Sequence, residues 1–185
     1  MGKIETNSGD IFKKGYLRYQ IFHILHAAEQ GGDSLLIDGL QVAEKMRLEH
    51  PDLFDILATT EVTWEFIKSS PPYMFHQSTG TTFRLDSSGK IIQLKYNNYH
   101  RATLKGINME NMEKFYTAYR LFTEMLNDPA NQFWIKLQPG TILFFDNWRL
   151  LHGRSSFNGR RMLTNGWFKR ETWENASRIH KMFQY

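Results

Sequence analysis

The sequence contains no cysteine among its 185 residues. This absence excludes a disulfide scaffold, a thiolate nucleophile, and zinc or iron–sulfur sites that depend on cysteine ligands. Any metal ion bound by this chain must therefore be held by histidine and carboxylate side chains.

Long apolar runs and dense clusters of one charge are also missing. No run approaches the roughly 18 residues of a membrane span, and the N-terminus shows neither a signal peptide nor a transit peptide. The formal charge is +4 and the pI is near 9.2, but the basic residues are scattered, with Arg160-Arg161 among the densest groups. A nucleic-acid interface needs a basic stripe or run. We therefore expect no membrane span and no nucleic-acid partner.

The length suits one domain, and the 15% aromatic content predicts a core rich in large rings. Apolar and β-branched runs predict strands at residues 17–26, 34–37, 62–68, 81–85, 90–96, 133–137, 141–145 and 161–169. Helical patterns occupy residues 40–50, 52–57, 109–127 and 171–183. Turn signals predict three hairpins, which join 17–26 to 34–37, 81–85 to 90–96, and 133–137 to 141–145. The pattern favours an α+β protein built on an antiparallel sandwich or jelly roll with outer helices.

The longest predicted helix is the clearest element, because Asn108 can cap its start and Asp128-Pro129 can end it. Its expected buried face consists of Met112, Phe115, Tyr116, Tyr119, Phe122, Thr123 and Leu126. We assign this stripe to the hydrophobic core and to no cofactor site.

One histidine and one arginine follow the last apolar strands in a pattern that suits ligand binding. The run FFDNWRLL leads to His152, and Gly153 beside it permits a close backbone approach. Arg161 comes nine residues later, and it shares a strand face with Leu163, Asn165 and Trp167. An imidazole, an arginine fork and an aromatic ring on one side would suit a metal ion with a bound dicarboxylate.

Spacing alone leaves simpler interpretations open. A lone histidine near a strand end is more often a hydrogen-bonded residue of the core or surface than a metal ligand. A lone arginine such as Arg161 is more often a partner in a salt bridge.

The amino-acid sequences of several segments resemble those of one protein family. FFDNWRLLHGRSSFNGRRML is similar to the C-terminal signature of the trimethyllysine and γ-butyrobetaine dioxygenases, within the wider taurine-dioxygenase-like superfamily. Further matching segments are QIFHILHAAEQGGDSLLIDGLQVAEKM, KYNNYHRA, FYTAYR and NQFWIKL. The resemblance runs from about Tyr19 to Arg178, and the distance from His152 to Arg161 brings it closer to the trimethyllysine enzymes.

The resemblance implies an Fe(II)/2-oxoglutarate oxygenase with a double-stranded β-helix core, which hydroxylates Nε-trimethyllysine in the first step of carnitine biosynthesis. In that family the iron sits on a His-x-Asp pair and a distal histidine, and His152 matches the distal one. Arg161 matches the arginine that binds the far carboxylate of 2-oxoglutarate, and Ser34 stands where a second residue contacts the same group. Phe22 lies on the strand that lines the cosubstrate pocket.

The resemblance also implies a substrate site and a setting in the cell. Asn97 and Trp167 match positions that contact the substrate, a small molecule with a quaternary ammonium group. Ascorbate is expected as the reductant, and a homodimer as the assembly. The family's trimethyllysine enzyme is mitochondrial, while the lack of a visible transit peptide leaves a cytoplasmic location open.

The sequence departs from the family at its start. The family's His-x-Asp should fall sixteen residues before His23, where this chain has Asn7-Ser8-Gly9. The one literal match, His50-Pro51-Asp52, lies between two predicted helices. We therefore expect an atypical, loose segment at 1–15 and an N-terminally truncated catalytic domain at 16–185, which is inactive alone.

Two alternatives stay open beside this hypothesis. The substrate could be γ-butyrobetaine, because most of the aromatic cage for the trimethylammonium group would come from upstream of this chain. The chain could also be a non-catalytic module that binds 2-oxoglutarate or serves as an interaction surface.

Overall fold

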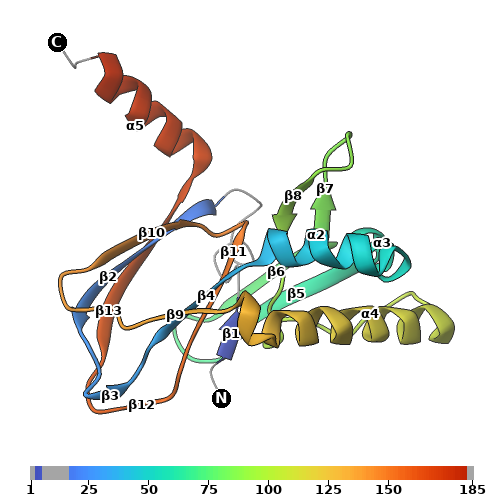
Figure 1. The fold of residues 1–185 in the computed structure, drawn as a ribbon, viewed down its shortest axis with the longest axis horizontal. Helices are drawn as coiled ribbons and strands as arrows, with labels where there is room; N and C mark the ends of the chain where they lie inside the picture. Colours follow the sequence, from blue (N-terminus) through green and yellow to red (C-terminus); the bar gives the residue numbers. More distant parts are fainter. Residues whose placement is uncertain (1–2, 6–16, 183–185) are drawn as a thin grey trace.

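The computed structural model describes residues 3–5 and 17–182, which form two larger antiparallel sheets, three two-stranded sheets and a layer of helices (Figure 1). The first sheet consists of β1 (Lys3–Glu5), β11 (Leu150–Arg154), β4 (Ser34–Asp38) and β9 (Phe133–Ile135), in that order. The second sheet consists of β10 (Ile142–Asp146), β2 (Leu17–His26) and β13 (Met162–Lys169). This content confirms the α+β class. None of the helices described is long and apolar enough to cross a membrane.

Strand β11 shows how alternation gives the first sheet two different faces. Leu151 is fully buried in the core on the helix side, and it pairs with Ile37 of β4. The next residue, His152, therefore points to the opposite face. Its ring lies 5.4 Å from the ring of Phe22 and 5.3 Å from that of Phe145. Because those two residues belong to β2 and β10, this face of the first sheet meets the second sheet.

The helices α2 (Gly39–Glu49), α3 (Pro51–Thr59) and α4 (Met109–Asn127) cover the other face of the first sheet (Figure 1). The Asp38 side chain caps α2 by accepting a hydrogen bond from the Gln41 backbone N–H at 3.2 Å. Asn108 caps α4 in the same way through the Asn111 N–H at 2.8 Å, as predicted. These helices and the sheet face beneath them form the main hydrophobic core.

The predicted buried stripe on α4 is confirmed at four of its seven positions, while Met112 and Thr123 are half-buried and Tyr116 is exposed. The members that are buried are Phe115, Tyr119, Phe122 and Leu126, all 5% exposed or less. Tyr116 is 40% exposed, so the prediction for this residue was wrong. Its neighbour Phe115 takes the centre of the stripe, and successive helix residues point about 100° apart. Tyr116 therefore reaches the margin, where its hydroxyl accepts a hydrogen bond from Arg101 at 3.2 Å.

Two small hairpins complete the helix side of the molecule. One pairs β5 (Glu61–Lys68) with β6 (Met74–Thr81), and the other pairs β7 (Phe83–Leu85) with β8 (Ile91–Leu94). The second hairpin was predicted, and the Asp86 carboxylate orders its turn by accepting the backbone N–H of Lys90 at 3.0 Å. Strand β6 was not predicted, because this segment is largely polar and exposed.

The other two predicted hairpins were wrong. Strand β2 pairs with β10 and β13, whereas β4 pairs with β11 and β9. Strands β2 and β4, which only the two-residue strand β3 (Gln30–Gly31) separates, therefore lie in different sheets, and so do β9 and β10. The hairpin prediction used only closeness in sequence, whereas here the connections cross from one sheet to the other.

The two ends of the chain lie on different elements. Helix α5 (Arg170–Met182) extends away from the sheets (Figure 1), and its Trp173 packs on Phe144 at 4.9 Å between ring centroids. Within the segment 1–15, which we expected to be loose, Lys3–Glu5 forms β1 and pairs with β11. The rest of that segment lies outside the described residues.

Candidate functional site

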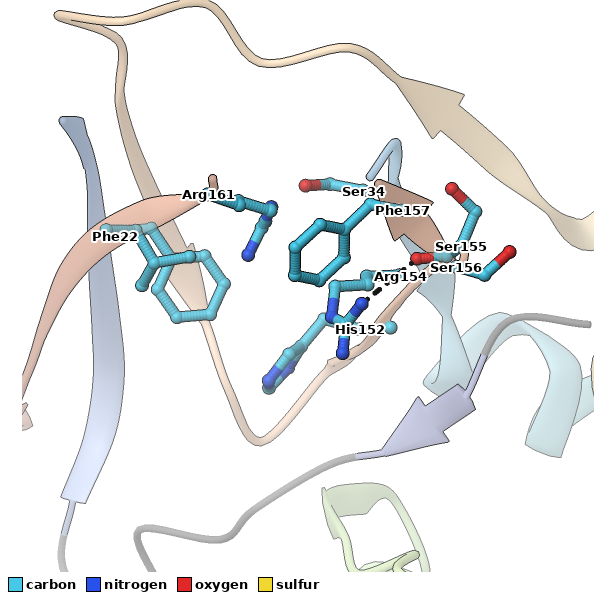
Figure 2. Close-up of a pocket in the computed structure, with 10 residues that line it drawn as sticks. Phe22, Ser34, His152, Arg154, Ser155, Ser156, Phe157 and Arg161 are labelled. Atoms are coloured by element: carbon cyan, nitrogen blue, oxygen red, sulfur yellow. Dashed lines mark hydrogen bonds between the residues drawn. The ribbon is translucent and has the colours of Figure 1, made fainter. Parts of the chain in front are cut away.

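A cavity of about 650 Å³ lies between the two sheets (Figure 2). Its lining comes from β2, β4, β11, the short strand β12 (Phe157–Asn158) and the start of β13. The lining residues are Phe22, Ser34, His152, Gly153, Arg154, Ser155, Ser156, Phe157, Arg161 and Leu163. Two of these residues are arginines and none is acidic, so the cavity suits an anionic ligand.

His152 is held as a neutral imidazole in the middle of β11. The rings of Phe22 and Phe145 pack edge-on against it, and its Nδ1 is buried without a hydrogen-bond partner among the described residues. Burial lowers the pKa of His152 to about 4, because the charged form would lose its hydration. At neutral pH the ring therefore keeps a lone pair that can bind a metal ion or accept a proton from a ligand.

The protein should lose stability on acidification between pH 6.5 and 4 because of His152. The pKa of His152 is about 4 in the folded chain against an ordinary value of 6.5, so in this range only the unfolded state binds the proton. The loss should reach up to about 3 kcal/mol of unfolding free energy and should be absent above pH 7. Urea unfolding at pH 7 and pH 4.5 measures it. His152→Gln should show a smaller acid-induced decrease, and an equal decrease in both proteins would contradict the assignment.

Arg161 and Ser34 supply hydrogen-bond donors on the two sides of the cavity. Arg161 precedes β13 and is half-buried, and no acidic side chain among the described residues pairs with it. Burial lowers the pKa of Arg161 from its ordinary value, and the charge of Arg154 lowers it further. Ser34 begins β4 and is 6% exposed. A carboxylate between them would accept hydrogen bonds from both side chains.

Gly31 fixes the loop that closes one side of the cavity. Its φ is +66°, and a Cβ atom there would overlap the carbonyl oxygen of Ser156, a lining residue. Gly31→Ala should therefore lower the unfolding free energy by at least about 2 kcal/mol, from left-handed strain together with this clash. Gly140 has a φ of +86° with open space around it, so Gly140→Ala should cost only about 1 kcal/mol. Urea unfolding compares the two variants, and equal losses would contradict the role of the contact.

The structure brings together four of the six predicted site residues. Phe22, Ser34, His152 and Arg161 line one cavity. Asn97 and Trp167 do not belong to its lining. Asn97 is 1% exposed, and its Oδ1 accepts the backbone N–H groups of the two residues at 99 and 100.

Trp167 and Asn97 share one property that matters for binding. The indole Nε1 of Trp167 and the Nδ2 of Asn97 are buried without a hydrogen-bond partner among the described residues. Trp167 pairs with Gln20 in the β13–β2 ladder, and Asn165 pairs with Phe22, so Trp167 lies on the sheet face that carries the cavity wall. A buried donor without a partner costs about 1–3 kcal/mol, which a ligand could recover.

Four of the lining residues were not predicted from the sequence, namely Arg154, Ser155, Ser156 and Phe157. The signal for Arg154 was present, because a residue two positions after His152 on a strand points to the same side. The positions of the two serines and Phe157 depend on the turn between β11 and β12. No periodic pattern in the sequence marks that turn.

The described residues do not form an iron site. No group of three histidine, aspartate or glutamate side chains converges among them, and His152 stands as a single imidazole. His50 stands directly before α3 without a side-chain capping bond and lies outside the cavity lining, so His50-Pro51-Asp52 supplies no ligands there. The predicted replacement of His-x-Asp by Asn7-Ser8-Gly9 falls outside the described residues. The cavity thus fits a dicarboxylate, whereas one ligand does not fit the three-ligand iron of the resemblance.

Solved structures share the fold of this chain. One described as an alpha-ketoglutarate dependent 2,4-D dioxygenase from Burkholderia xenovorans matches with a TM-score of 0.66 and 14% identity, over 92% of this chain and 69% of that one. Another, AAD-2 in complex with Mn(II) and N-oxalylglycine, matches with a TM-score of 0.62 and 11% identity, over 90% and 68% of the two chains. At this identity the likeness shows a shared fold.

Curated relatives match at higher identity. Mitochondrial trimethyllysine dioxygenase of Bos taurus is 36% identical over 162 residues, which cover 86% of this chain and 38% of the relative. Gamma-butyrobetaine dioxygenase of Homo sapiens is 34% identical over 138 residues, which cover 75% of this chain and 36% of the relative. The chain therefore spans less than two fifths of the length of these relatives.

A family model described as taurine catabolism dioxygenase TauD, TfdA family matches residues 11–167. This match includes the strands that carry Phe22, Ser34 and His152, and it includes Arg161. The chain belongs to the TauD, TfdA family of dioxygenases.

Proposed function

We propose that this chain binds 2-oxoglutarate as the cosubstrate of an Fe(II)/2-oxoglutarate-dependent oxygenase. The observation that carries the proposal is the cavity in which Arg161, Ser34 and Phe22 converge beside a neutral His152. Arg161 would bind the far carboxylate through its planar fork, with the Ser34 hydroxyl as a second donor. The apolar ring of Phe22 would pack along the carbon chain of the ligand. We also assign the two facing sheets to a double-stranded β-helix core.

We propose Nε-trimethyllysine as the primary substrate, and γ-butyrobetaine as the second candidate. The relatives named after these two substrates support both, and the identity is slightly higher for the trimethyllysine enzymes. The buried N–H groups of Asn97 and Trp167, which have no partner among the described residues, would bind acceptor groups of the substrate. A mitochondrial location, a homodimer and ascorbate as reductant belong to the same proposal by resemblance.

Calorimetric titration tests the binding step. 2-Oxoglutarate should bind to the purified chain, and trimethyllysine and γ-butyrobetaine should then compete with each other for the substrate site. Absence of 2-oxoglutarate binding, with Mn(II) present or absent, would contradict the proposal.

Turnover tests the iron site separately. The chain with Fe(II), ascorbate, 2-oxoglutarate and trimethyllysine should form no succinate above a metal-free blank, because His152 is the only candidate iron ligand that the described residues bring to the cavity. Mass spectrometry of succinate and of hydroxylated trimethyllysine measures the result. Succinate coupled to product would contradict this expectation and would place further iron ligands outside the described residues.

A further inference from the structure

Arg154 is a second guanidinium in the cavity, to which the family resemblance gives no role. It lies two residues after His152 on β11, so both side chains share the face toward the second sheet. In the β11–β4 ladder Arg154 stands opposite Ser34. Figure 2 shows Arg154, His152 and Arg161 as lining residues of the same cavity, with the Phe157 ring between the two arginines in this view. The cavity therefore has two cationic groups.

The Arg154 guanidinium is oriented by its neighbours. Its Cζ lies 4.5 Å from the centre of the Phe157 ring, and its Nη1 donates a hydrogen bond to the Ser155 carbonyl at 3.2 Å. A guanidinium carries five N–H donors in a planar fork. The contact with Ser155 uses one of them, so several donors are left for a ligand.

The charges of Arg154 and Arg161 have no acidic partner among the residues that the structure describes. Within that part of the chain, no residue of the cavity lining is acidic and neither arginine forms an ion pair. Their mutual repulsion contributes to the lowered pKa of Arg161. A ligand with two negative groups would remove this repulsion and supply an acceptor to each fork.

We propose that Arg154 binds the C1 carboxylate of 2-oxoglutarate while Arg161 binds the C5 carboxylate, so that the cavity holds the dicarboxylate without a metal ion. This inference rests on the 2-oxoglutarate binding proposed above and assigns its second anchor. The resemblance assigns the C5 carboxylate of 2-oxoglutarate to Arg161. The C1 carboxylate would then lie toward His152. Arg154 is the cationic side chain next to His152 on the same strand face.

Truncated ligands can separate the two anchors. 4-Oxopentanoate keeps the C5 carboxylate and replaces the C1 carboxylate with a methyl group, whereas 2-oxopentanoate keeps C1 and loses C5. Titrations with excess EDTA should show that the parent chain prefers 2-oxoglutarate over 4-oxopentanoate by on the order of fivefold to tenfold. Arg154→Ala should lose this preference and keep its affinity for 4-oxopentanoate. Arg154→Lys should retain part of the preference, because it keeps the charge without the planar fork.

Arg160→Ala is the matched control, since it removes the same charge from an exposed neighbour outside the cavity lining. It should leave the preference unchanged, and thermal melting should show that each variant is folded. The proposal is overturned if Arg154→Ala weakens both ligands equally. It is also overturned if 2-oxoglutarate binds only with Mn(II), a result that would leave the proposed function standing. No binding under either condition would remove both.

Discussion

Arg161→Ala is expected to weaken 2-oxoglutarate binding on the order of 100-fold. Arg161 is half-buried at the start of β13, and burial already disfavours its charge, as the lowered pKa shows. When a carboxylate binds to Arg161, the carboxylate and the guanidinium both lose water. The hydrogen bonds from the planar guanidinium must replace that lost hydration. Removal of the guanidinium leaves that carboxylate desolvated without a partner, and such truncations cost about 2–5 kcal/mol. Calorimetric titration at pH 7.5 measures the loss.

Two variants distinguish the bidentate geometry of the Arg161 guanidinium from its positive charge. Arg161→Lys keeps the charge but cannot bind the carboxylate in a bidentate way, so it should recover only a small part of the affinity. Arg160→Ala changes the net charge by the same amount outside the cavity lining and should leave the affinity within about twofold. Equal losses in Arg160→Ala and Arg161→Ala would show that binding follows net charge, and the cavity would lose its assigned anchor.

Local patterns predicted most elements and one buried face. The stripe on α4 follows from helix periodicity, and the cap at Asn108 follows from side-chain chemistry that involves only neighbouring residues. Strand pairing was predicted less well, because partners such as β2 and β13 are more than a hundred residues apart in the chain. Nothing in a short window identifies such a partner, which explains the two wrong hairpins.

The site residues depended on the resemblance more than on spacing. A histidine at the end of a strand and an arginine nine residues later have ordinary structural explanations, and only the matching family segments favoured a ligand site at His152 and Arg161. The structure adds the position of Arg154, which neither the spacing nor the resemblance predicted. The β11–β4 register sets Arg154 opposite Ser34 on the cavity face. The same structure leaves Asn97 and Trp167 outside the cavity lining, so their roles remain predictions.

Phe122→Ala should lower the free energy of unfolding by about 3–5 kcal/mol. Phe122 is fully buried on α4, and its ring packs edge-on against Phe83 at 4.9 Å and against Tyr96 at 5.8 Å. The truncation removes these contacts and leaves a void between helix and hairpin that rigid neighbours cannot fill. Such a loss is a large share of the roughly 5–15 kcal/mol that stabilises a domain. Urea unfolding at pH 7.5 gives the difference.

Phe133→Ala is the matched control, because Phe133 on β9 is 59% exposed and should cost less than about 1 kcal/mol. Phe122 lies in the core on the helix side of the first sheet, whereas the cavity opens on the opposite side. The fraction of Phe122→Ala that remains folded should therefore bind 2-oxoglutarate with the affinity of the parent chain. Similar unfolding losses in the two variants would contradict the position of the core. A weakened affinity in the folded fraction would show that the helix layer shapes the cavity through the sheet.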